Sequence, residues 1–586
     1  MNEQFLLLIS IGPVQDFISS ARKLRDLWFG SNLLSELSKR VAKSLHSQGC
    51  ELIFPAIENV SELEENSELI VANKILTSYS GTIPPKVIIA NAKKEWRKML
   101  ESIADDTKNE LRNYPLKVNE KVFDAQISDI GEFFGVWAQI GSDSYYNGRQ
   151  SIERLLSGRK KIREFEAPKW NGKGIPKNSL DGYRETVFTN KINELKGLLK
   201  KNEKLDAIGF IKRFYPIRKK AKNVEQFEDL ADIAIAPWLK AIKKGTKKPV
   251  LDTFESIIAS DTSNHRKNDK LSDNPILSEL YYVKKSDLND YISSESVENA
   301  WKKLRELRES AGEPTKYACI LLGDGDNMGK VIGEIKDMKG HKTFSRSLSE
   351  FAAHAKKIVS KNEGSLVYAG GDDVLAYAPM HTALLCANEL RKAFFKQMKK
   401  VIIDLGLKCQ IPTFSIGIAI VHYSEPLGNA LNLARETENI AKTIAGKDAL
   451  AIILKKRSGS PTQIYGKWDN FKGEKGIVED LHYLVQRLRD KNCETLQLSS
   501  RLAYQLRTAR IKGGDSINYH LSEDNKVVPE NAQSALVQAI FQHKDGGEEL
   551  VKEVLFGRTS IKCLADELII AKHFASLPIN LKENTE

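Results

Sequence analysis

A short acidic turn between two apolar runs is the feature that most limits how this chain can fold. Gly370-Gly371-Asp372-Asp373 separates the apolar residues 365–369 (SLVYA) from residues 374–378 (VLAYA). Two glycines can take the positive φ angles of a tight two-residue turn, so the sequence predicts a β-hairpin with adjacent carboxylates at its tip. Gly-Gly before Asp is also ordinary turn chemistry, and this stretch alone leaves both interpretations open.

A second acidic cluster favours a functional role for the carboxylates over an ordinary turn. Residues 317–323 (YACILLG) are typical of a fully buried strand, and they lead directly into Asp324 and Asp326, after which a helix is expected to begin near Met328. If the two acid-bearing strand ends are neighbours, four carboxylates meet at one edge of a sheet. Such a cluster is suited to divalent cations, because hard cations prefer oxygen ligands.

The segments around the two clusters support this adjacency. Apolar residues recur at helical spacing over residues 344–359 and again over 384–401, and a strand is expected over 413–421. The order strand, helix, hairpin, helix, strand is that of ferredoxin-like domains, in which the first strand lies beside the hairpin. The sequence therefore predicts an α+β fold in which Asp324, Asp326, Asp372 and Asp373 share one rim.

Carboxylates beside a helix start are typical of phosphoryl and nucleotidyl transfer, in which acids hold metal ions and backbone N–H groups receive phosphate oxygens. We expect Gly329 to allow close approach of a triphosphate and Lys330 to add positive charge, although a solvated surface lysine is the alternative. The nucleotide-binding residues predicted at this point are Gly325, Asn327, Met328, Gly329, Lys330, Gly370, Gly371 and Ser415.

These motifs resemble a known family. The run Asp324-x-Asp326-x-Met328-Gly329, the Gly-Gly-Asp-Asp turn, residues 414–422 (FSIGIAIVH) and residues 434–442 (ARETENIAK) resemble the cyclase/polymerase palm of the type III CRISPR large subunit. More distantly they resemble the catalytic domain of diguanylate cyclases.

The first residues narrow the resemblance. Residues 9–17 (ISIGPVQDF) and 21–35 closely resemble the N-terminal palm of the large subunit of the type III-B (Cmr) effector complex. We expect a helix to start at Pro13 and Ser31 to cap the next one. No acid pair accompanies this first strand, so the resemblance implies a second, noncatalytic palm-like domain packed against the catalytic one.

The resemblance also implies an activity and partners. It implies a nucleotidyltransferase activated by target RNA, which uses ATP and two Mg²⁺ or Mn²⁺ ions held by the four aspartates. The product would be cyclic oligoadenylate, or ATP joined to S-adenosylmethionine. Implied partners are the other subunits of the complex, the guide crRNA and the target RNA. Lys442 would face phosphate, with an exposed helix face as an equal alternative, and His422 is expected to be a core histidine.

Two differences from the family pattern lead to further expectations. The palm begins within ten residues of Met1 and the chain contains no His-Asp dipeptide, so we expect no HD-type nuclease activity. The six cysteines are far apart and form no Cys-x-x-Cys pair, so we expect no structural zinc site.

The positive net charge of the chain agrees with binding to a nucleic acid. The 586 residues include 89 basic and 77 acidic side chains, a formal net charge of +12, and the pI is near 9.0. Candidate phosphate-contacting runs are residues 159–163, 218–222, 243–248 and 455–457, with solvated surface as the alternative for each. Without a secretory signal or a long apolar span, the sequence favours a cytoplasmic protein without a membrane partner.

We predict four regions: a noncatalytic palm-like domain over 1–125, a mostly helical middle region over 126–296, a catalytic palm over 297–462, and a helical C-terminal domain over 463–586. Two alternatives to the enzyme remain at this point. One is a noncatalytic scaffold subunit of the complex, and the other is a stand-alone diguanylate-type cyclase.

Overall fold

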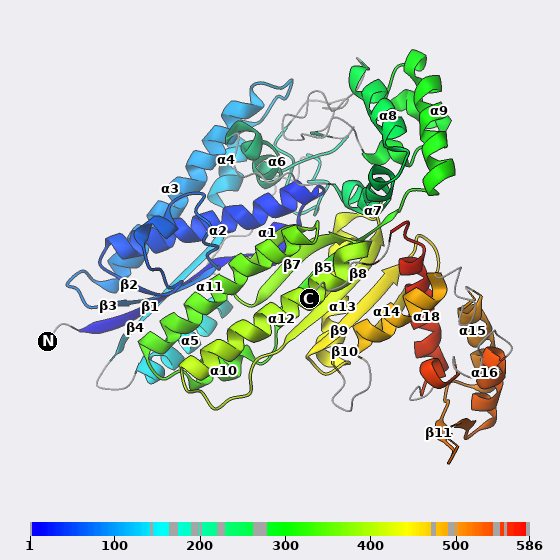
Figure 1. Cartoon of the computed structure of the whole chain (residues 1–586). Coiled ribbons are helices and arrows are strands. Elements are labelled where there is room, and N and C mark those ends of the chain that lie inside the picture. Colours follow the sequence, from blue (N-terminus) through cyan, green and yellow to red (C-terminus); the bar gives the residue numbers. More distant parts are fainter. Residues whose placement is uncertain are drawn as a thin grey trace.

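A computed structural model of the chain describes residues 3–140, 145–162, 174–188, 198–199, 202–219, 229–261, 278–469, 476–489, 498–499, 501–524, 526–542, 551–555, 559–579 and 581. Two sheets, each with helices packed on it, occupy most of this part, and two smaller helical regions lie beside the second sheet (Figure 1). The α+β class with two ferredoxin-like domains is confirmed.

The second sheet has the strand order that the sequence predicts. Its elements follow the chain as β5 (Tyr317–Gly325), α11 (Met338–Lys361), β6 (Ser365–Gly370), β7 (Asp373–Pro379), α12 (Met380–Asp404) and β8 (Phe414–His422). Strand β5 pairs antiparallel with β7 on one side and β8 on the other, and β6 pairs with β7. The ferredoxin-like order β8-β5-β7-β6 thus places the end of β5 beside the hairpin tip.

Two further strands extend this sheet. Helix α13 (Leu427–Thr443) leads from β8 to β9 (Ala449–Lys455), which pairs parallel to β8, and β10 (Thr462–Lys467) pairs antiparallel to β9. Strand β10 lies across the predicted domain limit at residue 462, so the second sheet reaches into the region assigned to the C-terminal domain.

The first sheet repeats the same topology with the order β2-β3-β1-β4. Its elements are β1 (Gln4–Gly12), α1 (Gln15–Ser19), α2 (Leu24–Ser47), β2 (Glu51–Phe54), η1 (Val60–Leu63), β3 (Lys74–Tyr79), α3 (Pro85–Leu111), α4 (Glu120–Ser128) and β4 (Glu132–Ile140). Strand β4 pairs with β1 along its whole length but lies beyond the predicted limit at residue 125.

One helix prediction in this domain is wrong. The first helix is only five residues long, and α2 runs without a break from Leu24 through Ser31 to Ser47, so Ser31 caps no helix. The break falls at residues 20–23 instead. Apolar residues continue at helical spacing across that break, and therefore periodicity alone could not locate it.

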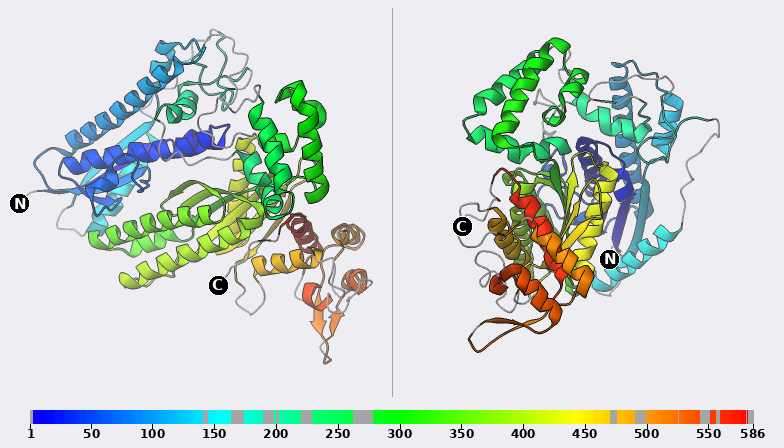
Figure 2. Two further views of the ribbon diagram at one scale, coloured as in Figure 1. Left: turned by 45° about the horizontal axis from the view of Figure 1, so that its top comes forward. Right: turned by 90° about the vertical axis from the view of Figure 1, so that its right-hand side faces the viewer.

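The two domains pack reciprocally. Helix α2 of the first domain contacts β6 of the second, and α11 of the second contacts β2 of the first. Ala56 N donates to Ser345 Oγ at 2.9 Å, and Arg346 Nη1 lies 2.7 Å from Glu62 Oε2. Figure 2 shows the two domains side by side from two further directions. A cavity formed at this junction is therefore lined by both domains.

The remaining described elements are mostly helical. The middle region contains α5 (Tyr145–Lys161), α6 (Ala207–Lys219), α7 (Leu230–Lys244), α8 (Lys248–Ser260), η3 (Ser278–Tyr281), η4 (Lys285–Asp290) and α9 (Ser294–Ala311). The C-terminal region contains α14 (Ile477–Arg489), α15 (Leu502–Gly513), β11 (Tyr519–Leu521), β12 (Val527–Pro529), α16 (Ala532–Gln542), η5 (Val551–Leu555) and α18 (Ile561–Ala575). Of the described helices, none has the length and apolar character needed to cross a bilayer. The side chains of the basic run 218–222 lie outside the described residues.

Candidate metal and nucleotide site

The β6–β7 hairpin presents two adjacent carboxylates. Gly370 pairs with Asp373 across the hairpin, which leaves Gly371 and Asp372 as its two turn residues. Gly371 has φ +71°, a value that glycine adopts without the steric cost of a Cβ atom. The other glycine of the motif, Gly370, ends strand β6. The turn therefore needs one glycine with positive φ rather than two.

Strand β5 holds this tip in place. Gly325 N donates to the carbonyl oxygen of Asp372 at 3.2 Å. A Cβ atom at position 325 would lie 2.8 Å from Asp372 Cβ and 2.9 Å from both Met328 Cγ and Phe394 Cζ. Only glycine at position 325 allows the strand end and the hairpin tip to approach this closely.

Three carboxylates converge where β5 meets the hairpin. Asp324, Asp372 and Asp373 each place a carboxylate oxygen within 4.8 Å of the others. Burial, followed by the charge of Asp373, raises the pKa of Asp372 to about 6, and burial raises the pKa of Asp373 to about 6. Carboxylates crowded in this way repel one another unless a cation neutralises them. The three side chains thus have the chemistry and the spacing of a divalent-metal site.

Asp326 lies behind this cluster rather than in it. Its side chain is 1% exposed, and its Oδ2 accepts hydrogen bonds from Thr413 Oγ1 (2.8 Å), Ser415 Oγ (2.8 Å) and Asp448 N (3.0 Å). Its Oδ1 is buried and has no hydrogen-bond partner among the described residues. Ser415 is fully buried against Asp326, which leaves its side chain no exposed surface for a nucleotide.

Helix α13 brings a lysine and a glutamate to the same place. A Cβ atom at Gly417 would lie 2.3 Å from Glu438 N, so glycine permits α13 to pack directly on β8. Lys442 Nζ forms an ion pair with Asp324 and lies 3.2 Å from Glu438 Oε1. Burial and then Lys447 lower the pKa of Lys442 to about 8, whereas burial and then Asp373 raise the pKa of Glu438 to about 7.

The sequence analysis missed Glu438. Its spacing of four residues before Lys442 on one helix was the available signal, because residues at i and i+4 face the same side. Lys442 itself was predicted to face phosphate, and the structure places its ammonium group against Asp324.

The residues after β5 turn sharply. Asn327 has φ +62° and precedes α10 (Met328–Glu334), and Lys447 Nζ donates to Asn327 Oδ1 at 2.9 Å. Met328 is buried, whereas Gly329 and Lys330 are exposed. Nucleotide contacts by these residues stay predictions.

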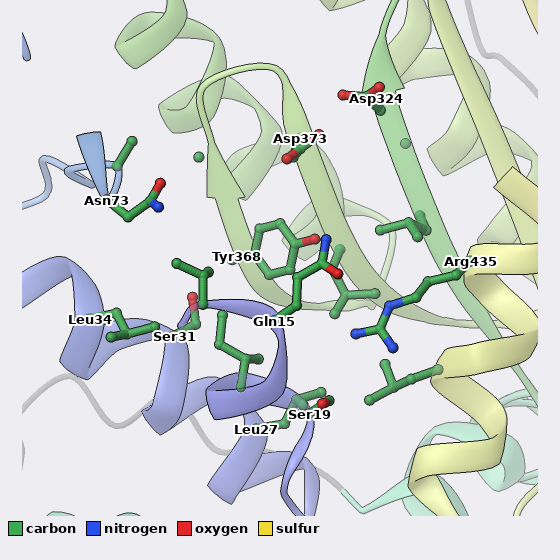
Figure 3. A pocket seen from close by; sticks show the side chains of 18 of the residues that line it. Gln15, Ser19, Leu27, Ser31, Leu34, Asn73, Asp324, Tyr368, Asp373 and Arg435 are labelled. Atoms are coloured by element: carbon green, nitrogen blue, oxygen red, sulfur yellow. The ribbon is translucent and has the colours of Figure 1, made fainter. Parts of the chain in front are cut away.

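A cavity of about 500 Å³ opens beside the carboxylates, between the two domains. The second domain lines it with Asp324, Tyr368, Gly370, Asp373, Arg435, Glu438 and Lys442, among others, and the first domain with Gln15, Ser31, Asn73 and their neighbours. Figure 3 shows Gln15 and Arg435 extending into the cavity from opposite domains, with Asp324 and Asp373 at its upper rim. Sequence reasoning did not identify this first-domain wall, because the first strand carries no acid pair.

Comparison with known families agrees with both halves of this arrangement. Residues 317–451 match the family described as "Cas10/Cmr2, second palm domain", and residues 6–117 match "CRISPR-associated protein Cmr2, N-terminal". The CRISPR system Cmr subunit Cmr2 of Pyrococcus furiosus is 29% identical over 556 residues, covering 78% of this chain. The chain thus resembles Cmr2 proteins in both of its ferredoxin-like domains. It spans 62% of the length of that curated relative.

Solved structures of a Cmr complex share the fold. A chain of the type III-B Cmr-beta complex in its apo state superposes with a TM-score of 0.64 at 13% identity, covering 98% of this chain and 82% of that chain. A chain of type III-B Cmr-beta bound to cognate target RNA gives the same TM-score and identity, with 98% and 83% coverage. At this identity the similarity shows the fold alone. The fold of this chain, including its two ferredoxin-like domains, thus has structural counterparts along nearly its whole length.

Proposed function

We propose that this chain is the nucleotidyltransferase subunit of a type III-B RNA-guided antiviral complex in the cytoplasm, and that it uses ATP to make an adenylated second messenger. The observation that carries the proposal is the convergence of Asp324, Asp372 and Asp373 at the rim of the interdomain cavity. A subunit with only a scaffolding role has no physical reason to crowd three carboxylates.

The donor nucleotide would lie at the carboxylate cluster. Asp324, Asp372 and Asp373 would hold Mg²⁺ or Mn²⁺ in front of Asp326, where bound metal supplies positive charge to a triphosphate and lowers the pKa of an attacking hydroxyl. Lys442 already lies against Asp324, and its ammonium group could turn to a phosphate oxygen once a cation takes that place. Glu438 keeps Lys442 at this position from one helical turn away.

The acceptor would occupy the cavity on the first-domain side. Gln15, Ser31 and Asn73 contribute amide and hydroxyl groups there, opposite the Arg435 guanidinium and the Tyr368 ring. Such groups can orient a second nucleotide, which would lead to cyclic oligoadenylate, or another molecule with a ribose such as S-adenosylmethionine. Both products share the donor ATP and differ only in what fills this part of the cavity.

The partners in this proposal follow from the similar proteins. The relatives are a subunit of a Cmr system and a chain of a Cmr complex bound to cognate target RNA. We therefore expect this chain to assemble with the other type III-B subunits, guide crRNA and target RNA, and to be active when target RNA is bound.

Mass spectrometry of the products tests this function. The assembled complex is incubated with ATP and Mg²⁺ or Mn²⁺, with and without target RNA and S-adenosylmethionine. We expect an adenylated product that requires target RNA and disappears in the Asp372→Ala, Asp373→Ala variant. The matched control is Glu523→Ala, Asp524→Ala, an exposed acid pair between β11 and β12.

The outcomes separate the three candidate functions. Product formation that persists in the Asp372→Ala, Asp373→Ala variant would refute the proposed site. A complex that assembles on RNA but makes no nucleotide product from any donor would identify a scaffold. A diguanylate product made from GTP without RNA would identify a stand-alone cyclase.

A further inference from the structure

Five aromatic rings form a continuous row at the edge of the second sheet opposite the carboxylates. Tyr282 stacks on Tyr423 (ring centroids 4.2 Å apart), and Tyr423 stacks on His422 (4.6 Å). The Tyr317 ring then meets His422 edge-on at 5.5 Å and His573 at 5.5 Å. The row joins the middle region, the start of β5, the end of β8 and helix α18.

This edge is remote from the candidate active site. Strand β5 begins at Tyr317 and ends at Gly325, so its two ends lie roughly 25 Å apart at the usual rise of a strand. The carboxylates lie at the far end of β5, and the ring row crosses the near end. The function proposed for the carboxylates therefore gives these rings no role.

Positive charge gathers at the part of the ring row formed by His422, Tyr317 and His573, whereas the carboxylates of Asp232 and Glu279 face Tyr282 and Tyr423. Burial first, and then Arg457 and Lys316, lower the pKa of His422, and Glu425 opposes them. That carboxylate is 2.8 Å from Lys455 Nζ and so is already paired. Burial first, and then Lys456 and Lys572, lower the pKa of His573 to about 4. Both histidines are therefore neutral near pH 7, among cations that precede β5 (Lys316), follow β9 (Lys456 and Arg457) and lie in α18 (Lys572).

An exposed ring adjoins these cations. Tyr504 of α15 is 50% exposed, and Lys572 Nζ lies 5.8 Å from its ring centroid. Packing within the protein does not require cations to gather here, since like charges repel and the rings already contact one another. An exposed aromatic face beside several cations is the combination that binds the bases and the phosphates of a single strand.

We propose that Lys316, Lys456, Arg457, Lys572 and Tyr504, here called the edge surface, bind the backbone of single-stranded RNA. The cations neutralise phosphates, and Tyr504 offers a stacking face to a base. Lys456 and Arg457 belong to the basic run 455–457, to which the sequence analysis assigned phosphate contact. An acidic protein segment would use the cations but would gain nothing from the exposed ring.

The identity of the nucleic acid rests on the proposed function, because that function includes RNA partners, but the edge surface needs no nucleotidyl transfer. RNA binding and product formation can therefore fail independently.

The test measures RNA affinity of the full chain by fluorescence anisotropy. The probe is a labelled single-stranded RNA of about 20 nucleotides without stable hairpins, longer than the site of one typical single-strand binding fold. Titrations between about 50 and 300 mM salt give the dissociation constant and its salt dependence. The variant is Lys456→Gln, Arg457→Gln. Its control is Lys399→Gln, Lys400→Gln, which removes two exposed cations from α12.

We expect the edge variant to bind the RNA roughly tenfold more weakly, and the slope of log affinity against log salt to fall by about 1.4, since each contact to a single strand contributes about 0.7. The α12 control should bind as the wild type does. Lys572→Gln, which changes one exposed side chain, should lower the slope by about 0.7 and serves if the double variant does not fold.

Wild-type affinity and slope in a folded edge variant would overturn the proposal. Normal RNA binding together with loss of assembly with other subunits would also overturn it, because the surface would then contact protein. The Asp372→Ala, Asp373→Ala variant should bind RNA as the wild type does. If the wild-type chain makes no nucleotide product while its RNA affinity depends on the edge surface, only the proposed function fails.

Discussion

Gly325→Ala is the most direct test of how the carboxylate cluster is built. The substitution adds one methyl group at the point where β5 meets the hairpin tip. Gly325 does not have a positive φ angle, so alanine brings no backbone strain and the effect is steric. The added carbon would lie 2.8 Å from Asp372 Cβ, whereas carbon atoms in contact prefer about 3.5–4.0 Å.

The structure sets the size of the expected effect. The tip must move by about 1 Å to restore normal contacts, and Phe394 in the core resists movement on the other side. Overpacking of this kind costs about 1–3 kcal/mol of stability. A shift of about 1 Å between Asp324 and Asp372 is expected to lower product formation by about 100-fold, because reacting groups must be placed more closely than that.

Two measurements on Gly325→Ala test this reasoning. Thermal unfolding should show a folded but less stable protein, and Mn²⁺ titration followed by electron paramagnetic resonance should show weaker binding. Gly333→Ala in α10 is the control, since nothing lies within 4 Å of the added carbon there. A Gly325→Ala protein with wild-type Mn²⁺ affinity and wild-type product formation would refute the proposed dependence on this close approach.

Three further predictions concern charge. In metal chelator, Asp372→Asn, Asp373→Asn should raise the free energy of unfolding at pH 7 by about 1–2 kcal/mol, a discounted value because both side chains are partly exposed. The sign follows from pKa values of about 6 in the folded protein against 3.8 in the unfolded chain, since the stability from these groups falls as pH rises from about 4 to 6. Denaturant titrations at pH 4.5, near the lower end of this range, and at pH 7, above it, measure the difference. Equal stability of variant and wild type at pH 7 would contradict the prediction. Lys442→Met should strengthen Mn²⁺ binding, because a cation that competes for Asp324 is removed, yet reduce product formation; weaker Mn²⁺ binding would show that the lysine supports the metal site instead. Arg213→Met should cost about 3–5 kcal/mol in denaturant unfolding, because its two buried carboxylate partners lose their counter-charge, and a loss below 1 kcal/mol would contradict this.

Local sequence patterns predicted most of the fold of the second domain. The acidic turn, the buried run at 317–323 and two helical periodicities predict a ferredoxin-like order, and the sheet has it. The first domain was predicted less well. Its helix break at residues 20–23 depends on buried contacts from a distant helix, since Lys212 Nζ of α6 donates to the carbonyl oxygens of Phe17 and Ser20. Contacts of that kind leave no local periodic signal.

The candidate site shows the same contrast between what local patterns predict and what long-range contacts decide. Asp324 and the hairpin acids could be placed together from strand adjacency, but Asp326 was assigned to the same rim only because it follows the same strand. Strand β5 ends at Gly325, Asn327 takes a left-handed conformation, and Asp326 between them is buried behind the carboxylate cluster. Its three hydrogen-bond donors come from outside β5, two of them before and within β8 and one after α13. Such long-range donors cannot be identified from spacing.

The reciprocal packing of the domains explains why one of them can lack acids and still contribute to the site. In two domains of the same topology, the β2–β3 connection corresponds to the β6–β7 hairpin. The hairpin has a two-residue turn, whereas the connection is long, and its last residues, 70–73, line the cavity together with Asp373. Equivalent segments of the two domains therefore meet across one cavity, one with carboxylates and the other with the Asn73 amide. Because the charged side is specified within the second domain alone, changes in 70–73 can alter what the cavity accepts without disturbing the carboxylate cluster.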